Sequence, residues 1–159
     1  KVAVPTAGIT TLKNHVHDGA IEGHCDCMFM VNTERWDFDR VAALVAPRPL
    51  LIANTDKDDI FPLDGVVSIY ANTRRIYKAL GAEAKIGLQI AEGPHKDTQP
   101  LNEGAFHWFE RWLKGADIMA VLDEGAPRGL WVVGDGTFGG EQGFERRSAG
   151  AGHQLAAMQ

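Results

Sequence analysis

The sequence predicts an α/β fold in which helices cover a parallel β-sheet. Three short apolar segments are typical of buried strands, and they alternate with three segments whose apolar residues recur every three or four positions, as in helices. The alternation favours parallel pairing, because a helix between two strands makes a crossover connection. The chain has 159 residues, of which 45% are hydrophobic. This length suits one domain with a substantial core.

The first predicted strand is separated from the first helix by a long loop. Val2–Pro5 is expected to form a short buried strand. Residues 13–35 show little periodicity, so we expect a loop there with at most one short helix. Residues 36–47, WDFDRVAALVAP, predict a helix of two to three turns that Asp37 or Asp39 caps at its N-terminus.

Two further strand–helix pairs follow. Residues 50–55, LLIANT, form an apolar run that suits a strand covered on both faces. The next helix is expected to be capped by Asp64 and ended by Gly81. Residues 85–92, KIGLQIAE, predict the third strand, and a third helix is expected over residues 101–114.

The pattern weakens after residue 115. We expect a partial domain over residues 1–115 and an irregular C-terminal tail over residues 116–159, because the tail is rich in Gly and Ala and has no clear period. Within it, GLWVV at 129–133 could add one more short strand, and residues 134–159 are expected to be mobile.

The composition argues against several partners. The formal charge of −5 offers no basic surface for nucleic acid. No apolar run approaches the 18–20 residues or so of a membrane span. Cys25 and Cys27 lie too close together for an ordinary disulfide with each other.

Ionisable side chains follow two of the predicted strands. Three aspartates, Asp56, Asp58 and Asp59, come directly after the strand at 50–55, and His95 follows the strand at 85–92. Carboxyl ends of parallel strands meet at one edge of a sheet. An acid there can orient an imidazole base and favour its protonated form. Each of the three aspartates is a candidate for that acid.

The order of the motifs resembles the C-terminal half of an α/β-hydrolase. The block LLIANTDKDDIFP, followed by a helix, a strand and EGPH, is similar to that of a bacterial acetyl xylan esterase and dienelactone-hydrolase-like group, and the match covers roughly residues 1–115. When this sequence is aligned with the family pattern on the apolar-apolar-Pro segment Ile60–Pro62, the resemblance implies that Asp58 is the acid and His95 the base. It leaves Asp56 and Asp59 as solvated turn residues.

A hydrolase triad also needs a nucleophile, usually a serine at a strand-to-helix elbow. Ser68 lies inside a predicted helix and Ser148 lies in the tail. The resemblance implies that the nucleophile and the first strands lie on sequence upstream, which leaves an open sheet edge here. Cys25 is an alternative nucleophile, since Cys25, Asp58 and His95 follow the order of a thiol triad, but it lacks the flanking glycines of an elbow.

The loop over residues 15–27 contains His15, His17, His24, Cys25, Asp26 and Cys27, which are residue types that bind zinc. Their spacing suits zinc poorly, so we expect a packed loop and no metal. His107 is expected to be structural or exposed. The aromatic cluster of Trp108, Phe109 and Trp112 is expected to belong to the core, with a sugar-binding platform as the alternative.

The sequence therefore predicts a serine-type carboxylic ester hydrolase in which Asp58 and His95 act without a cofactor. The resemblance implies a small ester or an acetylated carbohydrate as the substrate. The expected partner is the N-terminal half of the hydrolase fold or a second copy of this chain. The alternative is a non-enzymatic half-domain that associates through its exposed sheet edge.

Overall fold

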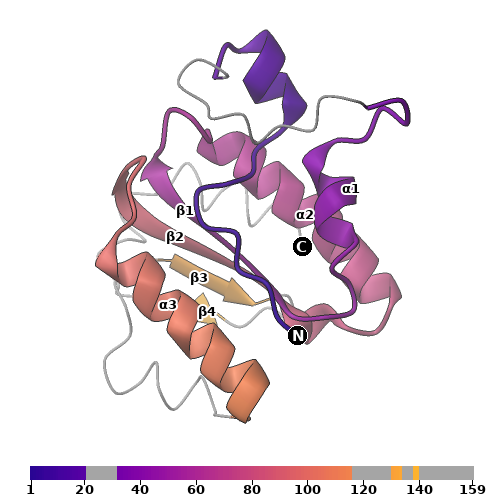
Figure 1. The fold of residues 1–159 in the computed structure, drawn as a ribbon, viewed down its shortest axis with the longest axis vertical. Helices are drawn as coiled ribbons and strands as arrows, with labels where there is room; N and C mark the ends of the chain where they lie inside the picture. Colours follow the sequence, from indigo (N-terminus) through magenta and orange to yellow (C-terminus); the bar gives the residue numbers. More distant parts are fainter. Residues whose placement is uncertain (21–31, 116–129, 134–137, 140–159) are drawn as a thin grey trace.

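Helices cover both faces of a small β-sheet (Figure 1). The computed structural model describes residues 1–20, 32–115, 130–133 and 138–139. In chain order the elements are the π-helical turn η1 (Lys13–His17), α1 (Phe38–Ala43), β1 (Leu50–Lys57), α2 (Leu63–Ala79), the 3-10 turn η2 (Glu83–Lys85), β2 (Ile86–Pro94), α3 (Gln99–Phe109), the π-helical turn η3 (Glu110–Lys114), β3 (Leu130–Val133) and β4 (Phe138–Gly139). Among these helices, none combines the length and the apolarity that crossing a membrane would require.

The described strands pair in the order β1-β2-β3-β4. β1 and β2 are parallel, with Leu50 opposite Ile86, whereas the β2–β3 and β3–β4 pairs are antiparallel. The mixed α/β architecture agrees with the prediction, but three parallel strands are not found. Two of the predicted strands, β1 and β2, form the parallel part of the sheet.

The first predicted strand, Val2–Pro5, joins β1 through two isolated parallel bridges, Ala3 to Leu50 and Thr6 to Ala53. Backbone bonds run from Leu51 N to Ala3 O (3.0 Å) and from Ala53 N to Pro5 O (3.0 Å). Proline has no N–H, so Pro5 cannot donate the bond that would join these bridges into a ladder. The proline is therefore the reason that the segment follows β1 without forming a regular strand.

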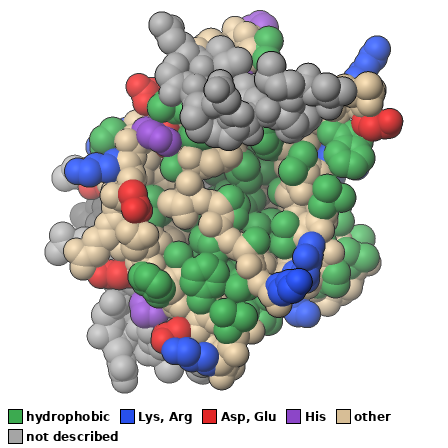
Figure 2. Space-filling model, viewed as in Figure 1, with side chains coloured by type: hydrophobic (Ala, Val, Ile, Leu, Met, Phe, Trp, Pro, Cys, Tyr) green, Lys and Arg blue, Asp and Glu red, His purple; other side chains and the backbone are tan. Residues whose placement is uncertain are grey.

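The backbone groups of Val2, Val4 and Thr6 alternate with those that face β1, so they point away from the sheet. Within the described residues, no backbone hydrogen bond engages these three residues. Hydrophobic side chains gather on this side of the molecule, over the N-terminal segment and the flanks of α1 and α3 (Figures 1 and 2). This edge has the backbone groups needed to accept a further strand.

β3 lies inside the stretch expected to be irregular, at the position where GLWVV suggested a further strand. It pairs with β2 from Gly87–Val133 to Ile90–Leu130, and so covers the edge of β2 that faces away from β1. The expectation of mobility for residues 134–159 falls almost entirely outside the described residues.

The core has two layers, one on each face of the sheet. On one face, Leu50 and Ile52 of β1 pack with residues of α1 and α2. On the other face, Leu51 packs against Trp108 of α3, which is fully buried. β1 is buried along Leu50–Thr55, as predicted for a strand covered on both faces.

Most helix ends lie where the sequence placed them. Asp37 is the N-cap of α1, and its side chain accepts a hydrogen bond from Phe38 N at 2.7 Å. Gly81 and Gly115 adopt positive φ after α2 and η3. The prediction that Asp64 caps α2 is wrong: Pro62 is the N-cap residue and Asp64 lies in the first turn.

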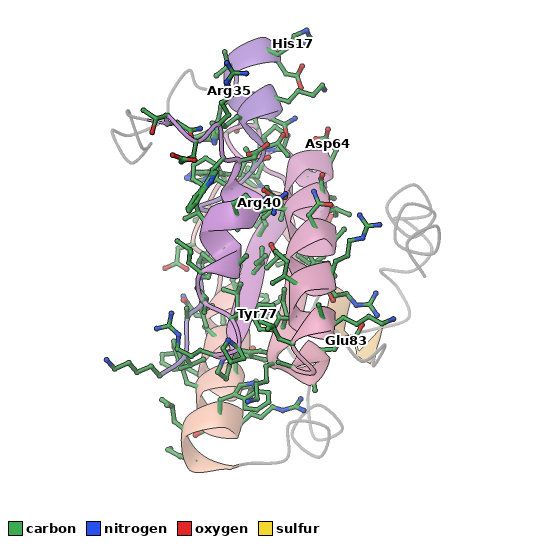
Figure 3. The ribbon with its side chains drawn as sticks, turned by 90° about the vertical axis from the view of Figure 1, so that its right-hand side faces the viewer. His17, Arg35, Arg40, Asp64, Tyr77 and Glu83 are labelled. Atoms are coloured by element: carbon green, nitrogen blue, oxygen red, sulfur yellow. The ribbon has the colours of Figure 1, made fainter. Side chains whose placement is uncertain are left out.

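Asp64 instead anchors a connection between η1 and the start of α2. Asn14 Nδ2 donates to Asp64 Oδ1 at 3.3 Å, and Thr10 Oγ1 donates to Asn14 Oδ1 at 3.0 Å. Figure 3 shows Asp64 at the end of α2 that lies toward η1, where His17 is labelled. Gly65 permits this approach, because a Cβ atom there would collide with the side chains of Asn14 and Thr10.

Candidate active site

The candidate site is built where β1 and β2 end side by side. Since the two strands are parallel neighbours, their C-terminal ends reach the same edge of the sheet. β1 leads into a turn that contains Asp58 and Asp59, and β2 leads through Pro94 into His95. Acidic and imidazole side chains thus come from different parts of the chain to one place.

The Asp58 side chain accepts hydrogen bonds from the backbone of its own turn. Its Oδ1 accepts hydrogen bonds from Ile60 N at 3.0 Å and Phe61 N at 2.8 Å. The Asp58 side chain is fully buried, and its second oxygen, Oδ2, lies 2.9 Å from His95 Nδ1. The two backbone donors fix the carboxylate, so that Oδ2 is presented to the imidazole.

His95 has one side toward Asp58 and one side toward solvent. Its side chain is 38% exposed, and its ring lies 5.6 Å from the Phe61 ring, between centroids. With Asp58 ionised, Nδ1 carries the proton in that bond, which leaves Nε2 as an acceptor in the neutral ring. Within the described residues, no hydrogen bond engages Nε2. One ring nitrogen thus contacts a carboxylate while the other makes no described hydrogen bond, which is the geometry that a general base requires.

The other two aspartates of the turn differ from one another. Asp59 is exposed, as expected of a solvated turn residue. Asp56 is not simply solvated: its Oδ1 accepts a hydrogen bond from Gly93 N at 2.8 Å. The sequence reasoning missed this contact, although the glycine before Pro94 at the end of a predicted strand was a signal of unusual backbone there.

Gly93 lies in an irregular part of the β1–β2 pair. Thr55 is opposite Ala91 and Lys57 is opposite Pro94, so β2 contains one more residue than β1 over this interval. Gly93 has φ +142°, a conformation that L side chains rarely adopt. Such a bulge bends its strand, and here it lies two residues before His95.

The candidate nucleophiles are not found beside His95 in the described residues. Ser68 is exposed in the second turn of α2, a helix interior and not a strand-to-helix elbow. Ser148 and the alternative nucleophile Cys25 lie outside the described residues. The described residues thus bring a carboxylate and an imidazole together, and none of the described serines lies at a strand-to-helix elbow.

The histidines of the expected loop have separate environments. His15 is buried, with its ring 5.7 Å from that of Phe38 and 5.9 Å from that of Phe61. His17 is largely exposed and lies 2.7 Å from Asp18 through Nδ1. Its hydrogen bond, together with that from Lys13, holds the pKa of Asp18 below its usual value.

Among residues 1–20 and 32–115 and the short described strands, no cluster of three or more His, Cys, Asp or Glu could hold a metal ion. His24, Cys25, Asp26 and Cys27 lie outside the described residues, so the zinc alternative is left as an expectation for them.

The aromatic cluster belongs largely to the core. Trp108 is fully buried, and its ring meets that of Trp112 edge to face at 5.7 Å. His107 is half-buried on the same helix. The structural interpretation of Trp108 is therefore confirmed over that of a sugar platform.

Comparison with known proteins gives a fold-level likeness. No protein-family model matches the chain, and no curated protein matches it. The glucuronoyl esterase catalytic domain from Hypocrea jecorina superposes with a TM-score of 0.54 at 15% identity, over 73% of this chain and 38% of that one. A carbohydrate esterase family 15 glucuronoyl esterase from Caldicellulosiruptor kristjansonii gives a TM-score of 0.49 at 26% identity, over 53% of this chain and 22% of that one.

The chain therefore spans well under half the length of the solved esterases that it resembles. The likeness to the Hypocrea jecorina domain shows a shared α/β fold over the matched part of the chain. The narrower resemblance to acetyl xylan esterases has no counterpart in these comparisons.

Proposed function

We propose that this chain is the acid- and base-bearing part of a carboxylic ester hydrolase. The observation that carries the proposal is the 2.9 Å contact between His95 Nδ1 and the buried Asp58 carboxylate at the ends of neighbouring parallel strands. The fold-level likeness to esterases supports the same reaction class.

In the proposed reaction, His95 Nε2 takes the proton of a serine hydroxyl as that oxygen attacks the ester carbonyl carbon. The resulting imidazolium is stabilised by Asp58. It gives its proton to the alcohol oxygen as the bond between that oxygen and the carbonyl carbon breaks, which leaves the acyl group on the serine. Water then attacks the acyl carbon while His95 takes its proton, and His95 passes that proton to the departing serine oxygen, which releases the carboxylic acid and restores the serine. No cofactor is required for these steps.

The serine is proposed to come from sequence outside this chain. The support is that Ser68 lies in α2, and that the solved esterases extend well beyond the matched part. For the substrate, we propose a small ester, with acetylated carbohydrate as the class implied by the sequence resemblance. Esters of glucuronic acid are the second class to test, because both solved neighbours are glucuronoyl esterases.

The test uses the native preparation, including any chain that travels with this one. Turnover of p-nitrophenyl acetate, an acetylated xylan fragment and a methyl ester of glucuronic acid should be lost in His95→Ala and after treatment with a serine-directed phosphonate. Peptide mass analysis should locate the phosphonate on a serine outside residues 1–159, either on sequence upstream or on a separate chain.

Turnover that survives His95→Ala would contradict the proposal. Phosphonate on Ser68 or Ser148 would contradict the external nucleophile. Inactivation by iodoacetamide but not by the phosphonate would favour Cys25 instead. A chain isolated from its nucleophile should be slower by several orders of magnitude, so the native preparation is the informative sample.

A second candidate function is a non-enzymatic module that associates through its sheet edge. The outward-pointing backbone groups of Val2, Val4 and Thr6 favour it, since an unpaired edge is a template for another strand. An intact native mass separates the candidates: a second, different chain supports the completed hydrolase, and a multiple of 17.3 kDa without ester turnover supports self-association.

A further inference from the structure

The Asp56 carboxylate lies two residues before Asp58 at the end of β1, and it contacts the last residues of β2, which lead to His95. Asp56 Oδ1 accepts from Gly93 N at 2.8 Å, two residues before His95. Thr55 Oγ1 donates to Pro94 O at 2.9 Å, one residue before His95. Two adjacent residues of β1 thus bind the last two residues of β2, directly before the histidine.

The backbone explains why such contacts are needed. Between the Thr55–Ala91 and Lys57–Pro94 pairs, β2 carries an extra residue, which leaves part of the ladder unmade. Gly93 adopts φ +142° within this interval, and a half-buried N–H there needs an acceptor that the regular ladder does not supply. The Asp56 carboxylate supplies that acceptor.

The consequence concerns the direction of His95. A regular parallel strand would continue along β1, whereas the bulge changes the course of β2 just before the histidine. The imidazole must lie within hydrogen-bond reach of Asp58 Oδ2, and small shifts of a base cost rate steeply, on the order of 10²-fold for about 1 Å. Fixing the bulge therefore fixes the base.

We propose that Asp56 is a positioning residue, which holds the Gly93 bulge so that the His95 ring lies on Asp58. The inference rests on the proposed function for its meaning in catalysis, but its structural content concerns the ring alone. Asp59 provides a matched comparison, because it has the same charge in the same turn and is exposed.

The experiment is nitrogen NMR of the full chain labelled with ¹⁵N, in which two-bond correlations report which nitrogen of the neutral His95 ring carries the proton. The wild-type chain should show the proton on Nδ1. Asp56→Ala should lose that preference and give a mixture of tautomers, while Asp56→Asn, which keeps an acceptor oxygen for Gly93, should retain most of it. Asp59→Ala should match the wild type, and His95→Gln identifies the resonance.

A second variant reaches the same bulge from the other strand. Gly93→Ala adds a methyl group with no atom within 4 Å, so its effect comes from the backbone conformation. It should also lose the Nδ1 preference, and it decides the question if Asp56→Ala does not fold. A wild-type spectrum in Asp56→Ala, or in Gly93→Ala when that variant must decide, overturns the inference.

Failure of the proposed function is recognised separately. If Asp58→Asn leaves the His95 tautomer unchanged, the pair itself does not form in solution, and the esterase proposal loses its main support. If Asp58→Asn changes the tautomer and Asp56→Ala does not, the pair stands and the positioning role of Asp56 is rejected.

Discussion

At the scale of single residues, Asp58 has a structural role besides its proposed chemical one. Its Oδ1 accepts two backbone N–H groups of the turn, one of them from the buried residue Phe61. A buried donor without a partner costs about 1–3 kcal/mol. The turn therefore depends on this side chain even in the absence of any substrate.

We predict that Asp58→Ala lowers the free energy of unfolding by about 1–3 kcal/mol. Asp58→Asn should lose less, since its amide oxygen can still accept from the turn. Urea denaturation followed by circular dichroism measures both. Asp59→Ala is the control and should stay within about 0.5 kcal/mol of the wild type; equal losses in Asp58→Ala and Asp59→Ala would contradict the prediction.

Tyr77 is a second residue whose environment makes a prediction. It lies in the last turns of α2 (Figure 3), and its hydroxyl donates to Arg48 O at 2.6 Å. Burial raises the pKa of Tyr77 to about 12 from 10.0, although the Arg48 charge acts in the opposite direction. The folded chain therefore holds this proton more tightly than the unfolded chain does.

A raised pKa stabilises the fold fully below the unfolded value and less as pH rises through the folded one. We predict that the unfolding free energy contributed by Tyr77 falls between about pH 10 and pH 12. Chemical denaturation of wild type and Tyr77→Phe across this range should show a steeper decline in the wild type. Parallel curves would show that the tyrosine does not titrate differently in the two states.

At the scale of elements, the contact between η1 and α2 depends on a glycine in a helix. In an isolated helix, Gly→Ala would stabilise by up to about 1 kcal/mol. At Gly65, however, the new methyl group would collide with the Asn14 and Thr10 side chains. The same Thr10 hydroxyl also lies 3.2 Å from Pro62 O, so its one proton is shared between two acceptors and displacing Thr10 disturbs the start of α2.

We predict that Gly65→Ala destabilises the chain by about 1–3 kcal/mol, the usual range for overpacking. Ser68→Ala, on the exposed side of the same helix, is the control and should be neutral or slightly stabilising. Thermal and urea unfolding measure both variants. A gain in stability at Gly65 would mean that η1 does not pack on α2 in solution.

Sequence periodicity predicted the helices and strands whose structure depends on residues close together in the chain. β1, β2 and the three helices follow from apolar spacing and from Gly81 and Gly115, because burial on two faces and helix termination leave local signals. The start of α2 was misplaced by two residues because Pro62 and Asp64 both suit a first turn. Asp64 is used in a contact with Asn14, fifty residues away, that no local rule contains.

The candidate site, like the fold, was predictable from the sequence only in part. Asp58 and His95 were among the candidates because each follows a predicted strand. The resemblance at Ile60–Pro62 then selected Asp58 from the three aspartates. The role of Asp56 was not found, since it depends on the register of β1 against β2 and on the bulge at Gly93. Register is a property of the pair, so neither strand's sequence contains it.

At the scale of the whole molecule, the sheet edge formed by residues 2–6 bears on whether the chain associates with other chains. Pro5 removes a donor that would face β1, and so it interrupts the inner side of the segment only. Proline on an edge usually protects it from pairing. Here the outward groups belong to Val2, Val4 and Thr6, and none of these is a proline.

We predict concentration-dependent association, measured by sedimentation velocity, that Val4→Pro weakens by removing an outward N–H. Ala3→Pro is the matched control: it removes the bond to Pro49 O (3.0 Å), so it should lower stability and not specifically prevent association. A chain that remains monomeric at every concentration would contradict this prediction.

Trp108 gives the molecule an optical reporter of its own. Its indole is shielded from water and lies over Gly87, where a Cβ atom would come within 3.2 Å of the ring. A shielded indole emits at shorter wavelength than a hydrated one, so in a chain whose other three tryptophans are replaced by Phe, loosening of α3 from the sheet should appear as a red shift in fluorescence. Undocking of that helix could thus be followed in real time without attaching a dye.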